Sequence, residues 1–177
     1  MTKEISAAIE IQLADLDHPS QAEAVVRLMD SYASDLAGGG QVLSEDVKKR
    51  LPSELAKRKN CLVFLAWSYS DATRGVERLP AGLAVCFEGF STFACKPLMN
   101  IHDVIVSPDF RRRGIAKQLF QRIETISRER GCCKLTLEVL EGNHGAVDLY
   151  RSIGFQAYQL DSAMGKAMFW QKQLEDN

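Results

Sequence analysis

The hydrophobic periodicity of the chain changes abruptly at Pro108, and this change restricts the fold more than any other feature. Residues 100–106 read as a buried strand that ends in three β-branched side chains. After Pro108, apolar residues recur at helical spacing, at Ile115, Leu119, Ile123 and Ile126. Gly131 then ends the helix, and residues 134–140 (KLTLEVL) alternate as a further strand. A strand, a crossover helix and a second strand predict two parallel neighbours in one sheet, so the predicted fold class is mixed α/β (α+β).

Further strands are predicted on both sides of this segment, at residues 9–13, 61–67, 83–87, 155–160 and 167–173. Together with the two strands already named, they make a central mixed sheet of about six to seven strands flanked by helices. A length of 177 residues fits a single domain, 1–177, that buries a core of its own.

Three more helices are expected to flank the sheet. The first begins at His18 and ends at the glycine run 38–40. The second is capped by Ser44, and Pro52 is expected to break it into two short pieces. The third covers residues 146–153 and ends at a glycine.

Charge and cysteine content exclude several classes of protein. Lysine and arginine (22) nearly balance aspartate and glutamate (23), so a net charge of −1 gives no general attraction for nucleic acid. The first residues show no apolar core of signal-peptide length, and no stretch approaches the apolar run of a membrane helix. Five cysteines without a C-x-x-C pair fit neither a disulfide framework nor a zinc site, and the adjacent Cys132 and Cys133 are interpreted as small hydrophobes. The expectation is a reduced, cytoplasmic protein that binds neither nucleic acid nor membrane.

The turn before the central helix is the strongest candidate for an anion site. Arg111, Arg112 and Arg113 precede Gly114, which stands where the helix begins, and Lys117 follows in its first turn. A helix start exposes backbone N–H groups without internal partners, and its dipole adds positive potential. Gly114 has no side chain, so an anion such as a diphosphate can approach the main chain closely. A solvated basic face is the alternative, and the patterns of a P-loop or a dinucleotide-binding turn do not occur in the sequence.

A second sequence motif lies about thirty residues after the arginine turn, at residues 143–155. The motif N-x-x-A-x-x-L-Y-x-x-x-G-F is complete as Asn143, Ala146, Leu149, Tyr150, Gly154 and Phe155. Residues 111–116 read R-x-x-G-x-A, and the order is strand, turn, long helix, strand and second motif. In this order the chain resembles the GNAT superfamily of N-acyltransferases. The resemblance covers about residues 83–172, and the first eighty residues match in outline only.

The resemblance implies acetyl-CoA as co-substrate, with no metal. Its pantetheine arm would pair, as an added strand does, with backbone groups of Val104, Ile105 and Val106. Its diphosphate would be held by the backbone amides of Arg111, Arg112, Arg113, Gly114, Ile115 and Ala116. In such folds the strand before the turn and the strand at 134–140 splay apart to admit the thioester, and a bulge near Asp103 would suit that geometry. Asn143 would lie beside the pantetheine or the acetyl group.

Amide formation from a thioester needs a neutral amine, a polarised carbonyl and a protonated leaving thiolate. With Asn143, the candidate catalytic residues are Tyr150 and His102. Tyrosine has an ordinary pKa of about 10 and is protonated at pH 7, so Tyr150 can act as the acid, with a core aromatic as the alternative. Histidine has an ordinary pKa of about 6.5, so His102 can act as the base, with a structural histidine as the alternative. Alternation puts His102 on the side of Val104. Carboxylates that could act through water or attract a cationic amine are Asp103, Glu138 and Glu141.

The predicted function is therefore an N-acetyltransferase that moves an acetyl group from acetyl-CoA onto a primary amine by direct attack. A compact chain favours a small-molecule amine over a protein amine, and candidates for the acceptor pocket, or else for the core, are Phe87, Phe90 and Phe93. Two other classes stay open: an acyl-CoA-binding sensor or regulatory domain without turnover, and a nucleic-acid binder that uses the three arginines. Dimers are common in the resembled family, so a homodimer is compatible with the chain.

Overall fold

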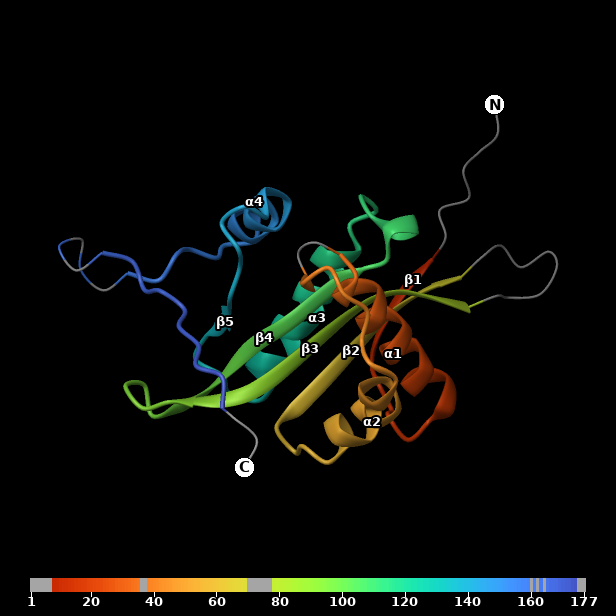
Figure 1. Ribbon diagram of the computed structural model, residues 1–177. Coiled ribbons are helices and arrows are strands. Elements are labelled where there is room, and N and C mark those ends of the chain that lie inside the picture. Colours follow the sequence, from red (N-terminus) through yellow and green to blue (C-terminus); the bar gives the residue numbers. More distant parts are fainter. Residues whose placement is uncertain are drawn as a thin grey trace. The chain divides into compact units, whose positions relative to one another are not determined.

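The computed structural model describes residues 8–35, 38–69, 78–159, 161, 163 and 165–174. The chain divides into two compact units, Met1–Leu137 and Glu138–Asn177. The sheet and its covering helices belong to the first unit (Figure 1). No α-helix in the described part of the chain has both the length and the apolar character needed to span a membrane.

The first unit is built on a five-stranded sheet whose strands lie side by side in chain order. These strands are β1 (Ile9–Leu13), β2 (Cys61–Tyr69), β3 (Arg78–Ser91), β4 (Lys96–Val106) and β5 (Leu135–Leu137). Neighbours pair antiparallel except β4 and β5, which are parallel, as the crossover predicts. The mixed α+β class is therefore confirmed.

Helices cover both faces of this sheet. α1 (Pro19–Ala33) and α2 (Glu45–Ala56) pack on one face, and α3 (Ile115–Glu129) packs on the other (Figure 1). α3 connects β4 to β5, and its predicted apolar positions are all buried: Ile115, Leu119, Ile123 and Ile126. At Gly82 of β3 an added Cβ would lie 3.2 Å from the Ile115 side chain, so a glycine lets α3 approach the sheet.

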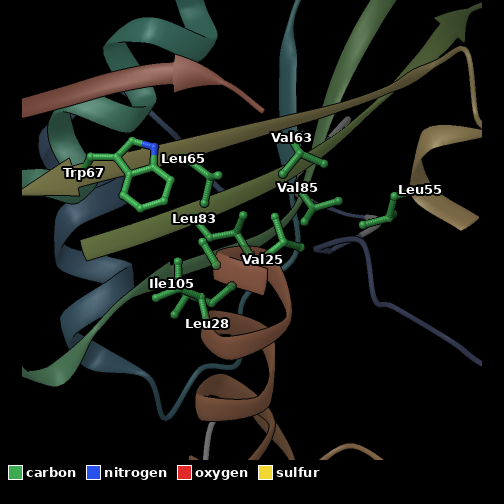
Figure 2. Packing of buried hydrophobic residues seen from close by; sticks show 10 residues of the cluster. Val25, Leu28, Leu55, Val63, Leu65, Trp67, Leu83, Val85 and Ile105 are labelled. Carbon is green, nitrogen blue, oxygen red and sulfur yellow. The ribbon is translucent and has the colours of Figure 1, made fainter. Parts of the chain in front are cut away.

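A cluster of buried apolar side chains fills the space between the sheet and its first two helices (Figure 2). The helices contribute Ala24, Val25, Leu28 and Leu55, and the sheet contributes Val63, Leu65, Trp67, Leu83, Val85 and Ile105. Burial of a large aliphatic side chain stabilises a fold by about 1.5–3 kcal/mol. This cluster therefore fixes α1 over β3 and β4, the strand that carries the candidate site.

The first helix ends earlier than expected from the glycine run. α1 stops at Ala33, and the glycines form a turn that folds back to the helix end. The Gly40 amide donates to the Asp35 carbonyl (3.0 Å) and so satisfies an oxygen beyond the last helical turn. A Cβ at Gly38 would collide with the Tyr32 carbonyl, so the turn requires glycine there.

The expected break at Pro52 is wrong. α2 runs unbroken from Glu45 to Ala56 with Pro52 inside it. A proline in a helix interior removes one backbone hydrogen bond, which ordinarily destabilises the helix by about 3 kcal/mol. The helix is supported instead at its ends, because the Ser44 hydroxyl accepts from the Val47 amide (3.3 Å) and Leu55 is buried in the core cluster.

The two expected C-terminal strands are not found. No strand is assigned over residues 155–159 or 167–173, and Leu160 lies outside the described residues. A backbone hydrogen bond from the Ala167 amide to the Tyr158 carbonyl (3.1 Å) joins the two segments, but one bond does not make a ladder. The strand expected at 134–140 is shorter than predicted, because β5 covers only Leu135–Leu137. The described residues thus form five strands, and the expected six to seven are not confirmed.

Candidate active site

A β-bulge in β4 lies at the centre of the candidate site. Val85 of β3 pairs with Asp103, and the next residue, Cys86, pairs with Ile101. His102 is therefore an extra residue without a counterpart in β3. The bulge expected near Asp103 is present, and it shifts the alternation of every later residue of β4 by one position.

This shift decides which backbone groups of β4 turn away from β3. The Ser107 amide donates to the Ala81 carbonyl (3.0 Å), which fixes the phase of hydrogen bonding between the two antiparallel strands. In this phase Ile105 turns its N–H and C=O toward β3. Val104 and Val106 turn theirs toward the outer edge of β4.

The outer edge of β4 loses its neighbour where the bulge begins. The last pair between β4 and β5 joins Ile101 to Leu137. β4 continues to Val106, so in the described structure its final stretch has β3 on one side and no strand on the other (Figure 1). An open edge of this kind can accept an extended ligand as an added strand.

The expected anion site is a turn that leads directly from β4 into α3. A 3₁₀ turn (Pro108–Phe110) follows the strand, and Arg112 and Gly114 then adopt left-handed conformations, with φ of 63° and 74°. Gly114 is the N-cap of α3 and provides no side-chain hydrogen bond. The first amides of α3 therefore lack a cap, and the helix dipole adds positive potential at the same point. The turn can thus offer backbone donors to an anion.

The three arginines of this turn have different surroundings, although all are exposed. The Arg113 guanidinium lies over the Phe110 ring, 5.3 Å from its centre. Arg111 Nε donates to the Val106 carbonyl (3.2 Å), and its Nη2 donates to the Asp35 carboxylate (2.9 Å). Arg111 is thus engaged by the protein on two sides.

The two bulge residues lie on the face of the sheet that α1 covers. The His102 ring packs edge-on against Phe87, with ring centroids 5.7 Å apart, and Phe87 borders the core cluster. Asp103 lies opposite Val85, a member of the same cluster. The expectation that His102 shares a side with Val104 is wrong, because the bulge reverses the alternation between them.

Negative charge gathers near Asp103 on this face. Burial raises the pKa of the Asp103 carboxyl, and the charge of His102 opposes that shift. Burial also raises the pKa of the Tyr32 hydroxyl on α1, and the charges of Asp103 and Asp35 raise it further. Tyr32 therefore lies near two carboxylates, of which Asp35 is paired with Arg111.

In the second unit, Asn143 begins the helix α4 (His144–Ser152). Its side-chain oxygen accepts a hydrogen bond from the Ala146 amide (3.3 Å), as an N-cap does. The first part of the N-x-x-A motif is thus a helix cap. With the oxygen used in this way, the Nδ2 group of Asn143 is the part of the side chain that can donate to a ligand.

The other end of α4 explains the rest of the motif. The Gly154 amide donates to the Arg151 carbonyl (3.1 Å) and the Phe155 amide donates to the Tyr150 carbonyl (2.9 Å). Gly154 has φ of 97°, so these bonds form a Schellman end with glycine in its usual place. Tyr150 therefore lies in the last turn of α4, with a structural role for its backbone.

The structure gathers the predicted residues into two groups. His102, the edge at Val104–Val106 and the turn at Arg111–Ala116 belong to the first unit, whereas Asn143 and Tyr150 belong to the second. Among the described residues, no group of three His, Cys, Asp or Glu side chains could hold a metal ion. The absence of a metal from the reaction stays a prediction.

The model of the acetyltransferase (GNAT) family matches residues 26–155, a span that includes β4, the arginine turn and α4. The chain belongs to the GNAT family. The predicted family is confirmed.

Named relatives of this GNAT protein are acetyltransferases. Streptothricin acetyltransferase of Streptomyces lavendulae is 37% identical over 163 residues, with 82% of each chain covered. Thialysine N-epsilon-acetyltransferases of Bos taurus and Caenorhabditis elegans are 29% and 30% identical over 42% and 43% of this chain. The chain spans less than half of their lengths, 44% and 47%.

Solved structures share the fold of this GNAT protein. A probable acetyltransferase has a TM-score of 0.73 at 23% identity, with 94% of this chain and 99% of that chain covered. The aminoglycoside N-acetyltransferase AAC(6′)-Iy in complex with CoA has a TM-score of 0.68 at 17% identity, with 95% and 97% covered. At these identities the likeness shows the fold alone.

Sequence reasoning missed Tyr32 and Asp35, which the structure brings to the site of this GNAT protein. Asp35 meets Arg111 across 76 positions of sequence, and such a contact leaves no local pattern. Of the three phenylalanines considered for a pocket, Phe87 contacts His102, whereas two others are exposed: Phe90 and Phe93.

Proposed function

We propose that the protein transfers an acetyl group from acetyl-CoA to a primary amine of a small molecule by direct attack. The observation that carries the proposal is the open edge of β4, with Val104 and Val106 turned outward, directly before a turn of arginines and uncapped amides. An extended ligand with a diphosphate at one end matches a strand edge followed by a helix N-terminus. Membership in the GNAT family supports the same function.

Acetyl-CoA would lie along this edge. The outward backbone groups of Val104 and Val106 would pair with the pantetheine arm, with Ile105 between them turned to β3. The amides from Arg111 to Ala116 would hold the diphosphate, and the guanidinium groups would add positive charge. Asn143 would donate from Nδ2 to the pantetheine or the acetyl group.

The reaction would require one proton to be removed and one to be supplied. The amine nitrogen attacks the thioester carbonyl carbon, so a C–N bond forms and the C–S bond breaks. His102 would accept the amine proton, directly or through water, and Asp103 would attract the cationic form of the amine. An outward N–H of β4 would polarise the carbonyl. Tyr150 would give its hydroxyl proton to the leaving thiolate and recover one from solvent.

A small-molecule amine is the proposed acceptor. The relative that matches 82% of the chain is named a streptothricin acetyltransferase, and a structural neighbour is an aminoglycoside acetyltransferase. The negative field around Tyr32 and Asp103 suits a substrate that arrives as a cation. Glu138 and Glu141, in the second unit, are further carboxylates that could attract the amine. A protein amine is the alternative acceptor.

The remaining parts of the proposal concern the whole chain. We infer one domain, 1–177, whose two units act together. The five cysteines are free, which suits a reducing compartment such as the cytoplasm. A homodimer is compatible with the proposal. The proposed function involves no metal, nucleic acid or membrane.

Calorimetric titration of the purified protein with acetyl-CoA at physiological salt tests the proposal. One-to-one binding in the micromolar range is expected. Release of free CoA is then measured with streptothricin, an aminoglycoside and a lysine-containing peptide as acceptors. Turnover with one of the small amines supports the enzyme, and turnover with the peptide alone would move the acceptor to protein amines. Binding without turnover would favour a sensor, and absence of binding would overturn the proposal.

A further inference from the structure

The side chain of Arg111 ties together three segments that are distant in sequence. Its backbone belongs to the turn between β4 and α3, where the Arg111 amide donates to the Pro108 carbonyl (3.3 Å). Nε reaches back to the carbonyl of Val106, the last residue of β4 (3.2 Å). Nη2 reaches across to the carboxylate of Asp35, just beyond α1 (2.9 Å). A planar guanidinium can make both contacts at once, which an ammonium group cannot do with the same geometry.

Asp35 is itself held in place by its backbone. Its amide donates to the Tyr32 carbonyl (2.9 Å), and its carbonyl accepts from the amides of Gly38 (2.9 Å) and Gly40 (3.0 Å). Gly38 approaches the Tyr32 carbonyl so closely that a larger residue would not fit. α1 is fixed in turn by the core cluster. The carboxylate that meets Arg111 therefore projects from a residue whose backbone is held by three hydrogen bonds.

Asp35 is negatively charged, yet it lies beside a turn that is proposed to bind an anion. The turn at Arg111 is built to attract an anion, and an acidic side chain at its side weakens that attraction by simple electrostatics. A surface ion pair alone contributes little to stability, typically about 0–1 kcal/mol. Loss of positive potential would thus be a disadvantage unless the contact also fixes the geometry of the turn.

We propose that Asp35 is a positioning residue, which acts through Arg111 to hold the turn that receives acetyl-CoA in register with the outer edge of β4. The inference rests on the proposed function in taking acetyl-CoA as the ligand. Diphosphate binding by backbone amides depends on their fixed orientation, because each donor must point to the same oxygens. Arg111 sets this orientation by joining the turn to Val106 on one side and to α1 on the other.

Charge and positioning predict opposite results for Asp35→Ala. If only charge matters, removal of a negative group strengthens acetyl-CoA binding. If Asp35 positions the turn, binding weakens, and we expect a Kd about fivefold higher, the effect of an ion pair of about 1 kcal/mol. Asp35→Glu should restore most of the affinity. Asp109→Ala is the matched control, because it removes the same charge from the exposed 3₁₀ turn and leaves the Asp35–Arg111 pair in place.

Calorimetric Kd values for these variants decide between the two roles, with circular dichroism to check the fold. Weaker binding by Asp35→Ala alone supports positioning. Tighter or unchanged binding by Asp35→Ala would overturn it. The double variant Asp35→Ala with Arg111→Lys should bind no more weakly than the weaker single variant, because both changes break the same contact.

Hydrogen exchange gives a reading that does not depend on the ligand. In the protein alone, a peptide covering residues 107–114 should exchange faster in Asp35→Ala than in wild type, while peptides of β2 and β3 stay unchanged. Asp109→Ala should leave exchange of that peptide at the wild-type rate. Equal exchange in all three proteins would contradict the proposal. If wild type fails to bind acetyl-CoA, the proposed function falls, and this measurement still tests whether Asp35 holds the turn.

Discussion

The Phe155 amide donates to the Tyr150 carbonyl at 2.9 Å, and the two aromatic rings lie 6.0 Å apart at their centroids. A hydrophobic contact between these two positions often accompanies a Schellman end, so the pair closes α4 through both backbone and side chain. The carbonyl and the ring of Tyr150 are retained by phenylalanine. Structure and chemistry at Tyr150 can therefore be separated by a single substitution.

Tyr150→Phe should lower kcat by about 10²-fold or more, because the leaving thiolate would lose its proton donor. The affinity for acetyl-CoA and the melting temperature should stay close to wild type. Steady-state rates, calorimetry and thermal melts measure these three quantities. Phe155→Leu is the control, since it should lower the melting temperature but leave the proton donor in place. An unchanged rate in Tyr150→Phe would remove Tyr150 from the mechanism.

Two glycines at opposite ends of α4 should respond in opposite directions to alanine. Gly154 has φ of 97°, so Gly154→Ala should lower the free energy of unfolding by about 1–2 kcal/mol. Gly145 lies inside the helix with open space around an added Cβ, so Gly145→Ala should be neutral or stabilising by up to about 1 kcal/mol. Urea unfolding measures both values. Equal effects of the two substitutions would contradict the assigned helix end.

Asp103→Asn should stabilise the protein at pH 7 and slow the reaction. Burial raises the pKa of the Asp103 carboxyl, so the folded protein holds this proton more tightly than the unfolded chain does. The resulting stability is fully present below the unfolded pKa of about 3.9 and is lost as the pH rises through the folded pKa. The gain from Asp103→Asn should therefore appear at pH 7 and vanish below about pH 4. Urea unfolding at both pH values checks this, and an equal gain at both would refute the burial argument.

Reversal of charge on the turn should abolish binding of acetyl-CoA. Arg111→Glu combined with Arg113→Glu places two negative groups beside the amides that would hold the diphosphate, and no heat of binding is expected in calorimetry. Arg122→Glu makes the same kind of change on an exposed position farther along α3 and should leave the Kd near wild type. Tight binding retained by the double variant would place acetyl-CoA elsewhere.

His102→Asn should change the dependence of kcat/KM on pH. The imidazole lies on the bulge beside Asp103, and as a base it would control the acidic limb of the profile. We expect a rate about 10²-fold lower at neutral pH and a flatter acidic limb. A profile that superposes on that of wild type would leave His102 with its packing against Phe87 as its sole role.

Local patterns predicted much of this fold because the forces behind them are local. The apolar spacing of α3 and the cap at Ser44 follow from neighbouring residues. The parallel pairing of β4 with β5 follows from the single helix that connects them. The motif at Asn143 and Gly154 was recognised by resemblance, and the structure gives its physical meaning as two helix caps.

Other features depend on contacts that sequence spacing does not encode. Pro52 stays inside α2 because tertiary packing outweighs the lost hydrogen bond. The pair of Asp35 with Arg111 forms only once α1 is docked on the sheet. The bulge at His102 could be suspected near Asp103, but the strand pattern gave no sign of which residue is the extra one.

Because of that extra residue, the residues of β4 that turn their backbone groups outward are odd-numbered before the bulge and even-numbered after it. Before the bulge, odd-numbered residues turn their backbone N–H and C=O groups toward the β5 side of the strand. The Met99 amide, for example, donates to the Lys134 carbonyl (3.0 Å). After it, the even-numbered Val104 and Val106 face the same edge. One strand thus uses its odd residues to complete the sheet and its even residues to present an open edge. Deletion of His102 would remove the bulge and join Ile101 directly to Asp103, so the alternation would be regular throughout and the same residues would face β3 and the open edge.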